Sequence, residues 1–189
     1  MSTIKNKHVI EIAKVGNVTL LVSSAAKHHP LYKKFRDRLD MHTTMLTVAL
    51  GHLCKVADIP ASRELQIILK PIKGNTDGWH YYRETSTLIE LDFRLWPTAL
   101  FETLMHELRH EHQILVGRYD ARNHFWDGQR VASKATTYKA YCNLPWEIDA
   151  FGNQRRMAKE LWDAMQPQLA NIVNRSPSLA LKVSQYAIR

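Results

Sequence analysis

Cysteine is scarce in this sequence, because only Cys54 and Cys142 occur among its 189 residues. They form no CxxC pair and build no disulfide framework, so we expect two reduced thiols in a cytoplasmic protein. The chain also lacks a run of about 18 apolar residues, which excludes a membrane-spanning helix. Its polar start, residues 1–7, does not have the pattern of a signal peptide.

Internal repeats and low-complexity segments are also absent from the sequence, which excludes repeat architectures. Apolar residues make up 45% of the chain and charged residues 23%, and these values are typical of a soluble globular protein. The length suits one domain with a buried core. We therefore predict a single domain over residues 1–189.

Basic residues outnumber acidic ones, and the formal net charge is +8 at pH 7. This balance makes nucleic acid a candidate partner. The basic residues are scattered, however, and the densest cluster is typical of the solvated face of a helix: Lys33, Lys34, Arg36 and Arg38. Histidine occurs ten times, and this high count directs attention to metal binding.

The N-terminal part of the chain predicts a hairpin and then a long helical segment. Alternating residues 8–14 and 18–23 flank Gly16-Asn17, which is typical of a tight turn between two strands. Residues 23–30 are small and polar, and they predict a loop. Apolar residues at helical spacing over residues 31–58 predict a helix that breaks near residues 42–44.

The middle of the chain predicts three strands. Residues 65–69 form one, and residues 79–83 and 88–93 form two more after a turn-rich segment. In the last strand Ile89, Leu91 and Phe93 face one way, which predicts a half-buried strand.

An amphipathic helix of about 18 residues is predicted next, with an apolar stripe that faces a core. Pro97 suits its first position, and Gly117 would end it. Residues 118–144 are irregular in pattern. Another helix is expected over residues 145–165, beyond which Pro167 and later Pro177 divide the tail into short helical pieces.

An HExxH motif lies within the Pro97 helix as His106-Glu107-Leu108-Arg109-His110. Helix positions four apart lie about 40° apart around the axis, so both imidazoles can bind one metal ion. Glu107 lies beside them, where a general base takes a proton from a metal-activated water. The motif therefore predicts that His106 and His110 hold Zn²⁺ and that Glu107 is the catalytic base.

A catalytic zinc ion needs a third protein ligand and one open position. We favour Glu147, which falls in the first turn of the next predicted helix, where small Ala150 allows a close approach to the motif. His124 and Asp149 are the alternatives, and Asp149 would also suit a support for a ligand histidine. His112 points away from the face that carries the motif.

These residues resemble a known group of proteins. The HExxH motif followed by Pro145-Trp146-Glu147-Ile148-Asp149-Ala150 is similar to short gluzincin-type metallopeptidases common in bacteriophage and prophage genomes. Those are distantly similar to ImmA/IrrE-type zincins, in which a glutamate in an E-x-x-A context supplies the third ligand. Trp126-Asp127-Gly128 and Tyr141 also look like that group. The resemblance covers residues 98–155.

The resemblance implies an α+β fold of the minimal zincin type, with a small mixed sheet whose edge strand lies over the HExxH helix and a helical C-terminal part. It implies a zinc-dependent metallopeptidase that acts on a protein or peptide substrate, in a bacterial host cytoplasm if the gene belongs to a phage. For such an enzyme we expect residues 88–93 to pair with an extended substrate. An oxyanion donor would come from the loop over the site: Arg122, His124, Tyr138 or Tyr141.

Two other functions stay open. One is a phage virion-associated or binding protein that retains the zincin fold and its metal. The other is an SprT-like DNA-associated protease, which would use His124 as the third ligand and would bind DNA with a steep salt dependence. The chain lacks the zinc ribbon that usually follows in SprT-type proteins, and the sequence does not indicate an oligomeric state.

Overall fold

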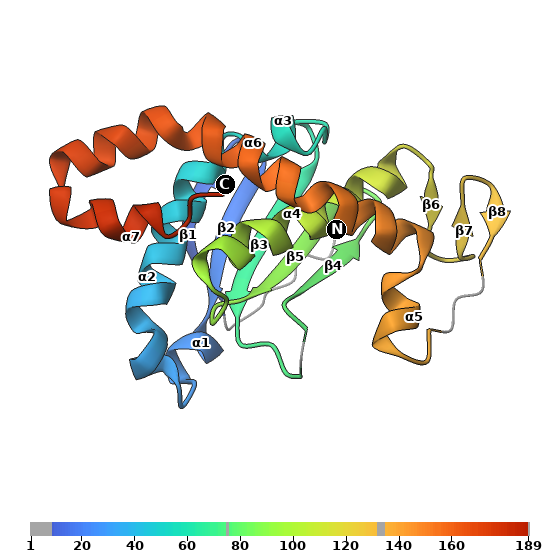
Figure 1. The fold of residues 1–189 in the computed structure, drawn as a ribbon, viewed down its shortest axis with the longest axis horizontal. Helices are drawn as coiled ribbons and strands as arrows, with labels where there is room; N and C mark the ends of the chain where they lie inside the picture. Colours follow the sequence, from blue (N-terminus) through green and yellow to red (C-terminus); the bar gives the residue numbers. More distant parts are fainter. Residues whose placement is uncertain (1–8, 75, 132–134, 189) are drawn as a thin grey trace.

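The N-terminal hairpin opens the fold that the computed structural model shows for residues 9–74, 76–131 and 135–188 (Figure 1). Strands β1 (Val9–Val15) and β2 (Val18–Ser23) pair antiparallel around Gly16, whose φ of 57° suits glycine. The predicted hairpin is thus confirmed, although His8 and the first seven residues lie outside the described parts.

Three further strands complete a five-stranded mixed sheet: β3 (Glu64–Lys70), β4 (Gly78–Tyr82) and β5 (Ser86–Asp92). The strand order is β1-β2-β3-β5-β4, in which β2, β3 and β5 run parallel and the two outer strands run antiparallel to their neighbours. The sheet and the helices packed on it confirm the predicted α+β class.

The environment of β5 differs from the prediction. Leu88 and Asp92 on its second face are also buried, so the strand is not half-buried. Leu88 packs with Leu21 and Ile68 in a small apolar cluster on that face. Because β4 returns antiparallel along β5, both edges of β5 are paired, and the expected pairing of a substrate with residues 88–93 is wrong. Among the strands of the described residues, β4 is the outermost on this side of the sheet and has the free edge.

The first helices differ from the prediction in two ways. Residues predicted as a loop form α1 (Ser24–His28), because the Ser23 hydroxyl caps it and Ala26 is buried. The helix α2 (Tyr32–Ala49) runs through the predicted break, since buried His42 bonds to the Leu95 carbonyl and the Tyr186 hydroxyl. The chain instead breaks after Ala49 and continues in α3 (Leu53–Val56).

The HExxH motif lies in α4 (Pro97–Leu115), whose predicted start and end are confirmed. Pro97 occupies the first turn, and Gly117 follows the helix with a φ of 73°. The stripe that includes Leu100, Leu104 and Leu108 is fully buried against the sheet side of the core. This packing determines which side of the helix is left for polar residues.

The segment predicted as irregular contains a small second sheet and a helix. Strands β6 (Tyr119–Asp120), β7 (Phe125–Trp126) and β8 (Gln129–Arg130) pair in order, and α5 (Tyr138–Cys142) follows. Asp127 and Gly128 both have positive φ between β7 and β8, as a two-residue hairpin turn requires.

The last long helix, α6 (Pro145–Arg175), is longer than predicted because Pro167 lies inside it. An internal proline costs about 3 kcal/mol. Burial of Met165 and Leu169 on either side of it contributes about 1.5–3 kcal/mol each, which offsets that cost. A 3-10 helix (Pro177–Leu179) and α7 (Ala180–Ser184) end the described chain.

One main apolar cluster joins the sheet to α2, α4 and α6, and α6 crosses over α4 (Figure 1). This crossing brings the start of α6 beside the C-terminal half of α4. Among the described residues, no helix combines the length and apolarity needed to cross a bilayer.

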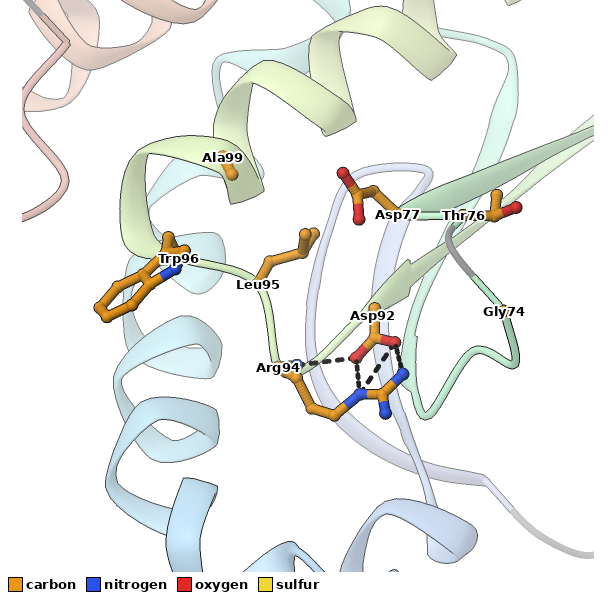
Figure 2. Close-up of a pocket in the computed structure, with 8 residues that line it drawn as sticks. All are labelled: Gly74, Thr76, Asp77, Asp92, Arg94, Leu95, Trp96 and Ala99. Carbon is orange, nitrogen blue, oxygen red and sulfur yellow. Dashed lines mark hydrogen bonds and ion pairs between the residues drawn. The ribbon is translucent and has the colours of Figure 1, made fainter. Parts of the chain in front are cut away.

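A hollow beside the β5–α4 turn is separate from that crossing (Figure 2). There Asp92 accepts hydrogen bonds from the backbone and guanidinium of Arg94, and the Arg38 guanidinium stacks on Trp96. These contacts fix the turn that starts α4.

Candidate metal centre

Three buried side chains meet where α4 and α6 cross: His106, His110 and Glu147. Their candidate ligand atoms all lie within 4.8 Å of one another. His106 Nε2 is 3.1 Å from His110 Nε2 and 3.1 Å from Glu147 Oε2. His110 Nε2 is 3.4 Å from Glu147 Oε1. The structure therefore brings together the two motif histidines and the glutamate that we favoured.

The spacing of these atoms fits a single metal ion. A tetrahedral ion with bonds of 2.0–2.1 Å separates its ligand atoms by about 3.3 Å. The two imidazole nitrogens are 3.1 Å apart, and different Glu147 oxygens lie 3.1 Å from His106 Nε2 and 3.4 Å from His110 Nε2, so the carboxylate reaches both nitrogens. Two imidazole nitrogens and one carboxylate are also a donor set that divalent metals accept. The group can therefore hold a metal ion.

Two glutamine amides orient the imidazoles. Gln154 Oε1 lies 2.9 Å from His106 Nδ1, and Gln113 Oε1 lies 3.0 Å from His110 Nδ1. An amide oxygen only accepts, so each Nδ1 carries a proton, and the Nε2 protons that bond to Glu147 would be released on metal binding. Two lone pairs and a carboxylate then face one another, an arrangement that a cation stabilises.

Asp149 has a different place from either role predicted for it. It is not part of the ligand group and does not bond to a ligand histidine. Its carboxylate accepts hydrogen bonds from Arg109 at 2.6 Å and from Gln113 Nε2 at 2.8 Å. Asp149 thus reaches His110 only through Gln113, because Arg109 occupies the other side of its carboxylate.

Glu107 lies beside the ligand group, on the side of α4 that faces β4. Its Oε1 would be only 3.0 Å from a Cβ added to Gly78, and Thr103 Cγ2 would be 2.8 Å from it. Gly78 therefore permits the close approach of the edge strand to the motif helix. Burial leaves Glu107 8% exposed and raises the pKa of its carboxyl group, despite the nearby His110 and His106.

The ligand residues influence one another's protonation. Burial by itself would raise the pKa of Glu147, but hydrogen bonds from His106 and His110 overcome it and lower that pKa to about 2. Burial opposes protonation of His110, yet its hydrogen bond to Glu147 raises the pKa of His110. Glu147 is therefore a carboxylate at neutral pH, as a metal ligand must be.

Tyr141 is the one expected oxyanion donor that contacts the ligand group, through a hydrogen bond to Glu147. Burial and the Glu147 charge raise the pKa of Tyr141 above its ordinary value, so the hydroxyl keeps its proton. Tyr138 is 76% exposed and contacts Cys142, and Arg122 is exposed on the β6–β7 turn. His124 is not among the grouped ligands.

His112 points away from the centre, as predicted, toward Asp58 at 3.4 Å. The sequence reasoning missed the roles of Gln113 and Gln154. Gln113 lies three residues after His110 on the same helix, so helical spacing could have indicated its contact. Gln154 comes from α6 and depends on the helix crossing.

Comparison of the chain with protein-family models, with curated proteins and with solved structures finds no match.

Proposed function

We propose that this protein is a zinc-dependent peptidase. The observation that carries the proposal is the convergence of His106, His110 and Glu147 directly beside the Glu107 carboxylate, under a sheet edge. A site that only bound a structural metal would need a fourth protein ligand. Three grouped ligands and an adjacent acid instead suit hydrolysis.

Zinc is the metal we favour because imidazole and carboxylate ligands in a tetrahedral arrangement suit it well. A zinc ion bound there would lower the pKa of water to about 7 and polarise a carbonyl group. The protein supplies the orientation of the ligands through Gln113 and Gln154. Their neutral amides fix the tautomers without adding negative charge to the centre.

Glu107 and Tyr141 would supply the remaining chemistry. Glu107 would accept a proton from the attacking water and return it to the leaving nitrogen, and its raised pKa makes the carboxylate a stronger base for the first transfer. The Tyr141 hydroxyl would turn from Glu147 when the substrate binds and donate its one hydrogen bond to the oxygen of the attacked carbonyl. The free edge of β4 would pair with the extended backbone of the substrate.

Metal analysis followed by a peptide-cleavage assay tests this function. We expect about one zinc per chain in the purified protein and its loss in His106→Ala and Glu147→Ala. His124→Ala should keep zinc bound with full affinity, whereas Asp149→Ala should weaken zinc binding without abolishing it, because Asp149 is not a ligand. Retention of full zinc affinity by Glu147→Ala would disprove the ligand assignment, and its loss in His124→Ala would favour the SprT-like alternative.

The cleavage assay should use mixed unstructured peptides, with wild type beside Glu107→Gln. Cleavage that disappears in a zinc-loaded Glu107→Gln variant would support the peptidase. Zinc binding without cleavage by the wild type would favour a binding protein that retains the metal site.

A further inference from the structure

A second buried cluster of charged residues lies next to the metal centre and outside its ligand group. It consists of Arg63 before β3, His80 on β4 and Glu111 on α4. Glu111 is 0% exposed, and its two oxygens lie 2.6 Å from Arg63 Nε and 2.7 Å from His80 Nε2. The cluster thus connects three elements that are distant in sequence.

Arg63 also binds the turn between β4 and β5. Its guanidinium donates hydrogen bonds to the carbonyl oxygens of Arg83, Glu84 and Ser86. The same group lies 4.8 Å from the centroid of the Tyr82 ring at the end of β4. Arg63 therefore attaches the whole β4–β5 hairpin to the carboxylate on α4.

Glu107 and Glu111 form one row along α4, because they are four positions apart. Gly78 and His80 form the matching row on β4, because residues two apart share a face of a strand. Gly78 lies over Glu107, and His80 bonds to Glu111. The contact between His80 and Glu111 therefore lies about one helical turn of α4 from Glu107, the expected catalytic base, in the same interface between α4 and β4.

The cluster is a weak source of net stability. Buried ion pairs cost desolvation energy, and apolar replacements of similar volume are often no less stable. Glu111 Oε1 has no aligned hydrogen bond, since the Arg63 Nε–H points to Thr87 Oγ1. We therefore expect the cluster to fix the position of β4 on α4 more than it raises the free energy of unfolding.

We propose that the contacts of Arg63, Glu111 and His80 fix the position of the edge strand β4 relative to the motif helix α4. We call this three-residue cluster the clamp. His80 and Glu111 act as positioning residues, since they keep the free edge of β4 in register with Glu107 and the metal ligands. The catalytic consequence of the clamp depends on the peptidase function proposed above. Its effect on the strand does not.

Hydrogen exchange at the β4 amides tests the clamp without reference to activity. His80→Leu removes the donor to Glu111, whereas His80→Gln replaces it with an amide donor. We expect exchange over Gly78–Tyr82 to be about 10-fold faster in His80→Leu, as local opening becomes easier. His80→Gln should restore slow exchange, and His52→Leu should leave it unchanged, since His52 contacts Gln168 instead.

Equal exchange in His80→Leu and His80→Gln, whether fast or slow, would overturn the clamp. Glu111→Gln gives a second test, because it keeps the shape of the side chain and removes the charge between Arg63 and His80. Faster exchange confined to β4 and its turn would support the proposal, and unchanged β4 exchange in this variant would contradict it.

Zinc content and peptide cleavage, measured in the same variants, distinguish a failure of the clamp proposal from a failure of the peptidase proposal. His80→Leu should keep about one zinc per chain, because no ligand has been removed, while kcat/KM falls about 100-fold through misplacement of the substrate strand. His80→Gln should recover most of that loss. If the wild type cleaves nothing, the peptidase proposal fails while the exchange experiment still decides the clamp.

Discussion

Gln113 accepts a hydrogen bond from His110, with 3.0 Å between Oε1 and Nδ1. The other end of the same amide donates to the Trp146 carbonyl and to Asp149 at 2.9 and 2.8 Å. One side chain on α4 therefore connects the candidate ligand His110 to the first turn of α6, which carries the candidate ligand Glu147. These hydrogen bonds hold His110 on α4 and the first turn of α6 in a fixed position relative to each other.

We predict that Gln113→Leu lowers zinc affinity about 10- to 100-fold, because the His110 ring loses the partner that fixes its tautomer and orientation. Competition with a chromogenic chelator would measure the change. Gln166→Leu is the matched control, since Gln166 is exposed on α6 and bonds only to the Trp162 carbonyl among the described contacts. Unchanged affinity in Gln113→Leu would show that packing alone orients His110.

The link from Asp149 to the centre is predicted to act through Gln113. Asp149→Asn should weaken zinc binding in the wild type, because it removes the charge that orients the Gln113 amide. In a Gln113→Leu background the same change should add little, since residues in one network are not additive. Fully additive effects in this double-mutant cycle would disprove the link.

Gly78→Ala should impair catalysis more than it impairs folding. The new Cβ would lie 3.0 Å from Glu107 Oε1 and 2.8 Å from Thr103 Cγ2, so β4 or Glu107 must move. We expect kcat to fall about 10- to 100-fold with zinc retained. Gly152→Ala, where the added Cβ meets no atom within 4 Å, should keep activity and stabilise α6 by about 1 kcal/mol.

Tyr141→Phe should reduce kcat about 100-fold and leave zinc content unchanged, if the hydroxyl donates to the developing oxyanion. Tyr138→Phe is the control, because that ring is 76% exposed and contacts Cys142 rather than Glu147. An equal loss in both variants, or none in Tyr141→Phe, would assign the Tyr141 hydroxyl a purely structural contact with Glu147.

His42 should make folding stability depend on acid pH. Burial lowers the pKa of His42 from 6.5 to about 4, so the unfolded chain binds the proton more readily. Stability from the neutral imidazole is full above pH 6.5 and falls by about 3 kcal/mol as pH decreases to 4.

Urea unfolding of the wild type and His42→Gln at several pH values would measure this effect. The difference between the two proteins should shrink as the pH falls from 6.5 to 4, because only the wild type carries the titrating group. A difference that stays constant across this range would contradict the prediction.

Local sequence patterns were sufficient to predict the structure of several parts of this protein. The spacing of His106 and His110, the proline at the start of α4 and Gly117 after it depend on helix geometry over a few residues, and the structure agrees with all of them. The Asp127-Gly128 turn also had a local signal, which was overlooked. Local rules are reliable there because the interacting atoms are neighbours in the chain.

Tertiary packing overrode the local pattern in other parts. The tail helix continues through Pro167 because buried Met165 and Leu169 hold it. The helix α2 continues through the predicted break because His42 has partners at Leu95 and Tyr186. In both places contacts distant in sequence contribute more than local propensity.

The sequence by itself determined the HExxH helix and pointed to Glu147 from its place in the first turn of the next helix. Only the tertiary structure decided that Gln113 and Gln154 orient the imidazoles and that β4 is the free edge. It also decided that His80 meets Glu111. Helix spacing is a property of the local backbone, whereas strand order and helix crossing depend on how the whole chain buries its apolar surface.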